Sequence, residues 1–515
     1  MSDINVLFVS SEAAPFIKTG GLADVSAALP KALKKGGVDV RLVLPLYSLI
    51  DKEGCGLKKL FDGCCVKMGN CEEWYSVYIN ETMHNYPVYF IEFNKYFERN
   101  GIYDDKNTHE AYYDNAFRYA FFNRAALQLA KDLNFRPDIV HVHDWQTCLI
   151  PYYLKREGDP FFQNTKSILT IHNLPYQGIY PSDVVPYAKV DWADFNMNAF
   201  EHYGQINFLK GGIRFADKIT TVSPNYAKEI VTPLGGAGLF WLLNERRSDL
   251  SGIINGIDTD LWNPMSDKNI AYPYDLESFK KGKEANKKAL REHFGLAQND
   301  SPVFSMVIRL TEQKGIRMFT ECIENVLQNM QAQMIVMGDG EVWAEAYLGN
   351  LPNYYAGQIS VSRFNSSLEH LIDAGSDFTI VPSIYEPCGL KQMYSQLYGT
   401  LPIVRATGGL ADTVVNYDEM TGLGTGFKFY DIAPSALYNT IGWANATYDD
   451  RPEHIAKMAQ MAMGQDFSWN RSAKEYLNLY REVKVYEKSV VLSHAFFVPV
   501  RDALWRISPD VEALC

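Results

Sequence analysis

The sequence predicts an α/β protein made of two similar domains, each built on a parallel sheet that is covered by helices. Three observations predict this class. Short apolar segments alternate with amphipathic segments along the chain, which is typical of parallel strands joined by helices. The hexapeptide Thr-Gly-Gly-Leu-Ala-Asp occurs twice, at residues 19–24 and 407–412. The chain of 515 residues is also longer than a single core usually supports, roughly 250 to 300 residues.

The predicted strands fall into two groups. Each strand is a short apolar run that ends at a polar or turn segment. The first group covers residues 6–9, 40–44, 88–92, 139–143, 167–171 and 218–222, and the second covers 303–308, 334–337, 378–381 and 402–404. Helices are predicted at 22–35 and 391–398, because apolar residues recur there at helical spacing.

The predicted domain junction lies near residues 252–264, before a charged stretch that runs to residue 300. We therefore expect a first domain at 1–255 and a second domain at 256–465. A last helix is predicted within 466–484, because Ala473, Tyr476, Leu477 and Tyr480 share one helical face. Residues 485–515 mix Val, Phe and Trp without a clear period, and the sequence predicts neither a fold nor a role for them.

Composition excludes several classes of protein. Acidic residues outnumber basic ones by 61 to 49, so a broad attraction to nucleic acid or to an anionic membrane is not expected. No apolar run is long enough to cross a bilayer. The first residues carry no positively charged leader, and eight cysteines are too few for a disulfide scaffold. We therefore expect a cytoplasmic protein with reduced cysteines.

The repeated hexapeptide predicts two anion-binding turns. Gly20 and Gly21 lie between an apolar strand and a helical segment, and Gly408 and Gly409 repeat that context. Glycine permits close approach of a ligand to the backbone, and the N-terminus of a helix favours phosphate. The alternative is that each glycine pair only permits a tight turn. Its repetition in the same context weakens that alternative.

Polar side chains follow two predicted strands of the second half. Arg309 and Lys314 follow the strand at 303–308, where open α/β sheets bind their ligands. A guanidinium and an ammonium suit a pyrophosphate whose charge grows as a bond to it breaks. Glu386 lies on the turn after the strand at 378–381, beside the backbone of Cys388, Gly389 and Leu390. We interpret Glu386 as a carboxylate that accepts hydrogen bonds from ligand hydroxyls, although such a residue is often only a solvated cap.

A second group of polar side chains follows the strands of the first half. His143 and Asp144 end one strand, and His172 and Asn173 end the next. The chain offers no sufficient set of metal ligands around them, so hydrogen bonding is favoured over a metal site. Gathered at strand ends, these groups are expected to face a cleft between the domains.

The chain resembles bacterial glycogen synthases and plant starch synthases in six motifs and in their order. These motifs lie at residues 18–25, 143–145, 171–173, 255–258, 309–315 and 386–390. The resemblance covers roughly residues 1 to 483. It implies two Rossmann-like domains that face a deep cleft, the GT-B arrangement, with the last helix crossing back to the first domain. It also implies transfer of glucose from ADP-glucose to the non-reducing end of an α-1,4-glucan with retention of configuration, without a metal or an organic cofactor.

The resemblance also implies roles for particular residues. His172, Glu386, Arg309 and Lys314 would be the catalytic group, in which Arg309 and Lys314 neutralise the departing diphosphate. Glu386 and the turn from Cys388 through Gly389 to Leu390 would hold the glucosyl unit. The remaining substrate-binding residues would be Lys18, Gly20, Gly21, Asp24, Asp144, Asn173, Asn255 and Thr407. The first domain would then serve the acceptor and the second the nucleotide sugar.

Two alternatives stay open at this point. One is a related retaining transferase with another nucleotide sugar, because phosphate-binding residues do not specify the base. The other is a glucan-binding protein of this fold without turnover, suggested by departures from the family pattern at Ile308, Ile384, Phe240 and Trp241. An oxidoreductase is disfavoured, because no GxGxxG pattern follows the first strand. The sequence predicts no oligomeric state.

Overall fold

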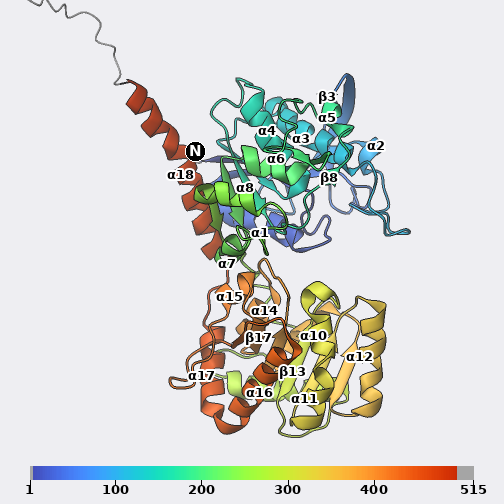
Figure 1. Ribbon diagram of the computed structural model, residues 1–515, viewed down its shortest axis with the longest axis vertical. Helices are drawn as coiled ribbons and strands as arrows, with labels where there is room; N and C mark the ends of the chain where they lie inside the picture. The colour runs from blue at the N-terminus through green and yellow to red at the C-terminus, as the bar shows by residue number, and fades with distance from the viewer. Residues whose placement is uncertain (1–3, 496–515) are drawn as a thin grey trace, which may run out of the picture.

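Two parallel sheets, one in each half of the chain, organise the fold. The computed structural model describes residues 4–495, and side chains as far as residue 484. In Figure 1 the first half (blue to green) and the second half (yellow to orange) form two bodies, one above the other. The prediction of an α/β protein with two domains is confirmed.

The first sheet contains nine strands among the described residues. Seven of them are parallel, and β4 pairs antiparallel with both β5 and β3. In spatial order they are β12 (Leu250–Gly252), β11 (Lys218–Thr221), β7 (Lys166–Ile171), β6 (Ile139–His143), β1 (Asn5–Val9), β2 (Asp39–Pro45), β5 (Val88–Glu92), β4 (Cys71–Asn80) and β3 (Lys58–Met68). The six strands predicted in this half are all present, within one residue at each end.

The second sheet contains six parallel strands in the described part of the chain. Their spatial order is β15 (Ile359–Ser362), β14 (Gln333–Met337), β13 (Val303–Val307), β16 (Phe378–Val381), β17 (Leu401–Arg405) and β18 (Phe427–Phe429). Numbered along the chain this order is 3-2-1-4-5-6, which is the Rossmann order. The parallel part of the first sheet has the same order with one more strand. Both halves are therefore Rossmann-like, as expected from the resemblance.

This strand order decides where ligands bind. In each sheet the direction of winding reverses beside the first strand, between β1 and β6 and between β13 and β16. Ligands of open α/β sheets bind at the carboxyl ends of the strands at this point. A ligand is therefore expected beside the residues that follow β1, β6, β13 and β16.

Helices connect the strands and cover both sheets. In the first half they are α1 (Gly21–Lys35), α2 (Asn94–Phe97), α3 (Asn115–Asp132), η1 (Trp145–Thr147), α4 (Leu149–Arg156), α5 (Val184–Tyr187), α6 (Phe208–Phe215), α7 (Pro224–Glu229), α8 (Phe240–Glu245) and η2 (Arg247–Asp249). In the second half they are α9 (Phe279–Phe294), η3 (Glu312–Lys314), α10 (Ile316–Thr320), α11 (Ile323–Asn329), α12 (Val342–Tyr354), α13 (Ser366–Gly375), α14 (Lys391–Leu397), α15 (Gly408–Thr413), α16 (Pro434–Asp450), α17 (Pro452–Met463) and α18 (Trp469–Ala495). A small antiparallel sheet of β8 (Ile179–Tyr180), β10 (Gln205–Asn207) and β9 (Glu201–His202) lies within the first half.

The last helix returns to the first half. In Figure 1 α18 runs back along the upper body, where it contacts α1, and its Tyr476 and Tyr480 are buried in the first core. The helix continues to Ala495, eleven residues beyond the predicted limit at 484. Residues 481–495 contain neither glycine nor proline, so nothing in their backbone chemistry ends the helix there. Residues 496–515 of the unassigned tail lie outside the described residues.

The passage between the halves lies between β12 and α9. β12 is the last strand of the first sheet, whereas Trp262 already packs with Phe279 and Tyr398 of the second half. The boundary that the sequence suggests, at residue 255, falls between these two points and stays a prediction.

Candidate active site

A cleft of about 1230 Å³ lies between the two halves, at the carboxyl ends of both sheets. Residues from both halves form its walls. The first half contributes Asp144, His172 and Asn173, and the second contributes Arg309, Lys314 and Glu386, together with Cys388, Gly389 and Leu390. The structure thus brings together residues that are far apart in the sequence, as the strand-end rule predicts.

Glu386 is a buried charged group of this cleft with two side-chain partners. It lies on the turn between β16 and α14 with 6% of its surface exposed. Lys314 places its Nζ 2.5 Å from Oε2 of Glu386, and Ser383 donates its hydroxyl to the same oxygen over 2.9 Å. A buried carboxylate needs such partners, because an uncompensated charge is costly away from water. Arg309, by contrast, is exposed on the cleft wall.

The second copy of the hexapeptide supports the turn that carries Glu386. A Cβ on Gly408 would lie 1.9 Å from the backbone oxygen of Glu386, and one on Gly409 would lie 2.0 Å from that of Cys388. The amide of Gly409 donates to the oxygen of Glu386 over 3.1 Å. These glycines are therefore required for close packing of two backbone segments. They do not line the cleft themselves.

The N-terminus of α15 already binds a carboxylate of the protein. Glu229, at the end of α7 in the first half, accepts hydrogen bonds from the Gly408 amide at 2.9 Å and from the Thr407 hydroxyl at 3.2 Å. Glu229 satisfies these donors in the structure, and the expectation that this copy binds a ligand phosphate stays a prediction. Thr407, expected among the substrate-binding residues, is 2% exposed and is not brought to the cleft.

This contact between the halves is reciprocal. Asp412, in α15, accepts a hydrogen bond of 2.7 Å from the backbone amide of Asn225, in the first turn of α7. Ser223 donates its hydroxyl to the backbone oxygen of Pro387 over 2.7 Å, next to Glu386. Each of the two short helices thus receives a carboxylate from the other half at its N-terminus, where the helix dipole favours negative charge. We call the contacts of Glu229 and Asp412 the interdomain caps.

The first copy of the hexapeptide does line the cleft. Gly20 and Gly21 face it, and in the described part of the chain no atom lies within 4 Å of a Cβ built on either residue. Glu12, which follows β1, holds this loop by accepting from the amide and the hydroxyl of Thr19, at 2.5 and 2.8 Å. Open space beside a helix start is what a ligand phosphate requires.

Lys18 and Asp24 do not face the cleft in this structure. They form an exposed ion pair in which Nζ lies 2.8 Å from Oδ1, and neither is among the residues that line the cleft. Lys18 keeps 55% of its side chain exposed. Exchange of Asp24 for another partner would cost Lys18 little free energy, because an exposed ion pair contributes only about 0 to 1 kcal/mol to stability.

Asp144 has an unusual backbone for a residue that is not glycine. Its φ is 54°, in the region that glycine favours, and such strain is often kept at functional sites. Its Oδ1 accepts from the amide of His172 over 2.7 Å, so it ties the ends of β6 and β7 together. Burial raises the pKa of Asp144 to about 7, although the backbone amides of His172 and Asn173 act in the opposite direction.

Two amide side chains of the cleft keep an oxygen available. Among the described residues, Oδ1 of Asn173 and Oδ1 of Asn255 are buried without a hydrogen-bond partner. Both residues line the cleft. Buried polar atoms are rarely left unpaired in folded proteins, so each is a candidate to accept a hydrogen bond from a ligand.

Several cleft residues were not identified from the sequence. Glu12, Asp339, Phe364, Glu369 and Lys391 line the cleft, and Phe364 is 53% exposed. Glu12 carries a signal that could have revealed it, because it is a charged residue in the loop that follows β1. Phe364 and Glu369 carry no comparable signal, since they belong to the loop and helix after β15.

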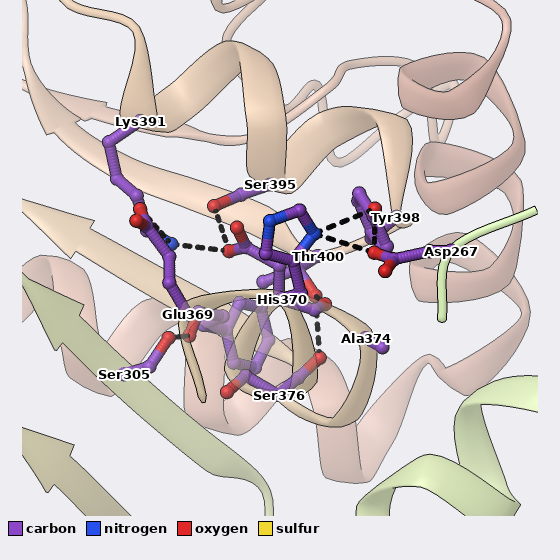
Figure 2. A network of polar contacts seen from close by, with 12 residues as sticks. Asp267, Ser305, Glu369, His370, Ala374, Ser376, Lys391, Ser395, Tyr398 and Thr400 are labelled. Carbon is purple, nitrogen blue, oxygen red and sulfur yellow. Dashed lines mark hydrogen bonds and ion pairs between the residues drawn. The ribbon is translucent and has the colours of Figure 1, made fainter. Parts of the chain in front are cut away.

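A buried charge network supports the wall formed by Glu369 and Lys391 (Figure 2). Lys391 places its Nζ 2.6 Å from Asp373 and 3.4 Å from Glu369, and Ser395 also donates to Asp373 over 2.6 Å. Asp267 lies 2.6 Å from His370, which follows Glu369 in α13. The network connects α13 to α14, the helix that begins directly after the Glu386 turn.

The described residues contain no group of three or more His, Cys, Asp or Glu side chains that could hold a metal ion. The seven cysteines within the described range are all free thiols. No helix in that range is long and apolar enough to cross a membrane.

Comparison with known proteins decides the family. The model of the starch synthase catalytic domain matches residues 5–245, and that of glycosyl transferases group 1 matches residues 288–485. A glycogen synthase of Treponema denticola is 43% identical over 493 residues, which cover 93% of this chain and 98% of that protein. The chain belongs to the glycogen and starch synthase family.

Other members of the glycogen and starch synthase family agree. Glycogen synthase 1 of Geobacter metallireducens is 40% identical to this chain, and the match covers 93% of this chain and 96% of that protein. The catalytic domain of starch synthase IV from Arabidopsis thaliana was solved with ADP and acarbose. It matches this structure with a TM-score of 0.83 and 31% sequence identity, over 94% of this chain and 100% of that domain's chain. The resemblance read from the motifs is confirmed, and this family member is a glycosyltransferase with the GT-B fold.

The departures from the family pattern leave the cleft chemistry in place. Ile308 lines the cleft, and the turn at Ile384 is held by Arg405, which donates to the backbone oxygens of Ser383 and Ile384. Phe240 and Trp241 lie in α8 and are not among the cleft residues. None of these four positions removes a charged partner of Glu386.

Proposed function

We propose that this protein transfers glucose from ADP-glucose to the non-reducing end of an α-1,4-glucan, with retention of the anomeric configuration. Its family membership supports a nucleotide sugar and a glucan as substrates. The observation that carries the proposal is the meeting of Lys314 and Glu386, anchored to each other, with Asp144 and His172 across one cleft.

Arg309 and Lys314 are the cations we assign to the diphosphate of the donor. Both lie at the carboxyl end of β13, on the cleft wall. As the bond to the sugar breaks, negative charge grows on the departing diphosphate, and positioned cations stabilise it most where water is excluded. Gly20 and Gly21 offer open backbone from the opposite wall. Lys18 joins them by leaving Asp24 when the donor binds.

Glu386 is assigned to hold the glucosyl unit rather than to attack it. Its Oε2 is occupied by Lys314 and Ser383, which leaves the other oxygen to accept from sugar hydroxyls. A retaining enzyme with a covalent intermediate needs a carboxylate that is free to act as nucleophile. The paired state of Glu386 supports instead a front-face displacement, in which the departing phosphate takes the proton of the incoming hydroxyl and the protein positions both partners.

The acceptor side is assigned to the first half. Asp144 and Asn173 order the donor sugar and the incoming glucan end, and Asn255 supplies a further acceptor oxygen.

The exposed ring of Phe364 offers a flat surface for the base of the nucleotide. The turn beside the glucosyl unit is formed by Cys388, Gly389 and Leu390.

The test is transfer of labelled glucose to glycogen by the purified protein, with ADP-glucose and UDP-glucose in parallel, each with and without EDTA. We expect elongation from ADP-glucose that EDTA does not affect. Transfer from UDP-glucose alone would indicate the related transferase, and glucan binding without transfer from either donor would indicate a binding protein. Analysis of the first product by NMR checks that the new linkage keeps the α configuration.

A further inference from the structure

Three histidines lie side by side on β6 and at the end of β7, and only one of them lines the cleft. His141 uses both ring nitrogens within the protein: Nδ1 lies 2.7 Å from the hydroxyl of Tyr480 and Nε2 lies 2.6 Å from that of Thr170. His143 lies next to it, and its Nδ1 is 3.0 Å from Nε2 of His172. His172 is the one on the cleft wall.

The ring of His143 has a fixed place and one polar contact. Its side chain is fully buried, with the ring of Phe8 at 4.2 Å between centroids. Its backbone is held by Thr147, which accepts from the His143 amide over 2.7 Å and donates to its carbonyl over 2.8 Å. Among the described residues, Nε2 of His143 has no hydrogen-bond partner.

Both rings of the pair are neutral at ordinary pH. Burial lowers the pKa of His143 well below its usual value and lowers that of His172 to about 3. A neutral imidazole carries one hydrogen, so in the contact between His143 and His172 one nitrogen donates and the other accepts. Two arrangements satisfy the contact, and they differ in which nitrogen of each ring carries the hydrogen.

The unpartnered nitrogen of His143 decides between them. If His143 accepted at Nδ1, its hydrogen would be on Nε2, and a buried N–H would be left without an acceptor. Such orphaned donors are rarer than unfilled lone pairs in folded proteins. If His143 donates from Nδ1, only a lone pair stays unfilled at Nε2. His172 then accepts at Nε2 and carries its own hydrogen on Nδ1.

We propose that His143 is a positioning residue that holds His172 in the tautomer with hydrogen on Nδ1, so that His172 donates a hydrogen bond to an oxygen of the bound sugar. His172 contacts His143 through Nε2 and lines the cleft, so Nδ1 is the ring nitrogen left to contact a ligand. This inference rests on the proposed function, which identifies the sugar that His172 contacts. The opposite tautomer would present a lone pair at the same place, which can accept a hydrogen bond but cannot donate one.

The tautomer is measured directly by the ¹⁵N chemical shifts of histidine-labelled protein, with His172 assigned from a His172→Asn sample. We expect His172 to show a protonated Nδ1 and an unprotonated Nε2, and His143 to show a protonated Nδ1. A protonated Nε2 on His172 would overturn the proposal. Because this readout needs no substrate, it separates the tautomer from the proposed function, which is tested by the glucose-transfer assay.

Two substitutions test the consequence for turnover. His143→Asn keeps a donor close to the position of Nδ1, whereas His143→Leu removes it at similar volume. We expect His143→Leu to lose about tenfold in kcat/KM, as for one hydrogen bond, and to show a mixture of His172 tautomers. His143→Asn should stay within about threefold of the wild type and keep the single tautomer. Equal losses in both variants, with the His172 tautomer unchanged, would contradict the assignment to the Nδ1 donor.

Discussion

Nζ of Lys314 lies 2.5 Å from Oε2 of Glu386, across 72 residues of sequence. The two side chains come from the ends of β13 and β16, which are neighbours in the second sheet. A cation and a carboxylate that were expected to act on different parts of the donor therefore form one unit before any ligand binds. Removal of either leaves the other without its partner in a largely buried place.

We expect Lys314→Ala and Glu386→Gln each to lower kcat by about 10² to 10³, the usual loss when one positioned group is removed from a charged transition state. The matched control is Arg317→Ala, because Arg317 follows on the same segment, pairs with Glu312 and is exposed outside the cleft. Steady-state kinetics with ADP-glucose at saturating glycogen measures the loss. Circular dichroism shows whether each variant is folded. A folded Lys314→Ala with near-normal kcat would refute the role of this pair.

The two copies of the hexapeptide provide a matched test of packing. Gly408 has a φ of 43° and no room for a Cβ, whereas Gly21 has open space. Gly408→Ala is therefore expected to destabilise the protein by several kcal/mol, through strain and displacement of the Glu386 backbone. Gly21→Ala is expected to change stability by about 0.5 kcal/mol or less. Urea unfolding of both variants measures the difference. Equal stability of the two would show that the close packing at Gly408 is not required.

The interdomain caps predict a link between stability and the relative position of the two domains. Glu229→Ala removes the acceptor of the Gly408 amide and the Thr407 hydroxyl, and should cost about 1 to 2 kcal/mol, as for a lost helix cap. We also expect a larger radius of gyration in small-angle scattering, because the contact joins α7 to α15. Glu245→Ala is the control, since that residue pairs with Arg214 inside the first half. Unchanged scattering for Glu229→Ala would exclude a role of the caps in domain position.

The buried histidines predict a loss of stability in acid. Burial lowers the pKa of His141 to about 3, whereas in the unfolded chain it is about 6.5. Between these values the unfolded chain binds more protons than the folded one, so the free energy of unfolding falls as the pH falls. For this residue the loss between pH 7 and pH 5 is about 2 kcal/mol.

His141→Gln cannot titrate in this range and tests that prediction. Its stability at pH 7 is expected to be lower than that of the wild type, because the contacts with Tyr480 and Thr170 change. Its further loss on going to pH 5 should be smaller by about 2 kcal/mol than that of the wild type. Urea unfolding at the two pH values gives both numbers. Parallel losses in the two proteins would show that His141 does not bind a proton on unfolding.

Local patterns predicted most of the parallel sheets. The strands β5, β6 and β16 have the predicted bounds, because buried parallel strands are short continuous apolar runs. The hairpin of β3 and β4 was missed, although its Gly69-Asn70 connection is a turn signal. Much of β3 faces water, and an exposed strand lacks the apolar run that marks a buried one.

The sequence by itself determined the α/β class, the doubled Rossmann-like organisation, the family and most of the polar groups at strand ends. Those features follow from local periodicity and from short motifs, which are written in neighbouring residues. Only the tertiary structure decided that Lys314 pairs with Glu386, that Glu229 caps the second glycine turn, and that His143 contacts His172. Each of these depends on which strand ends meet, and that is set by the packing of the whole sheet and of the two domains rather than by any local pattern.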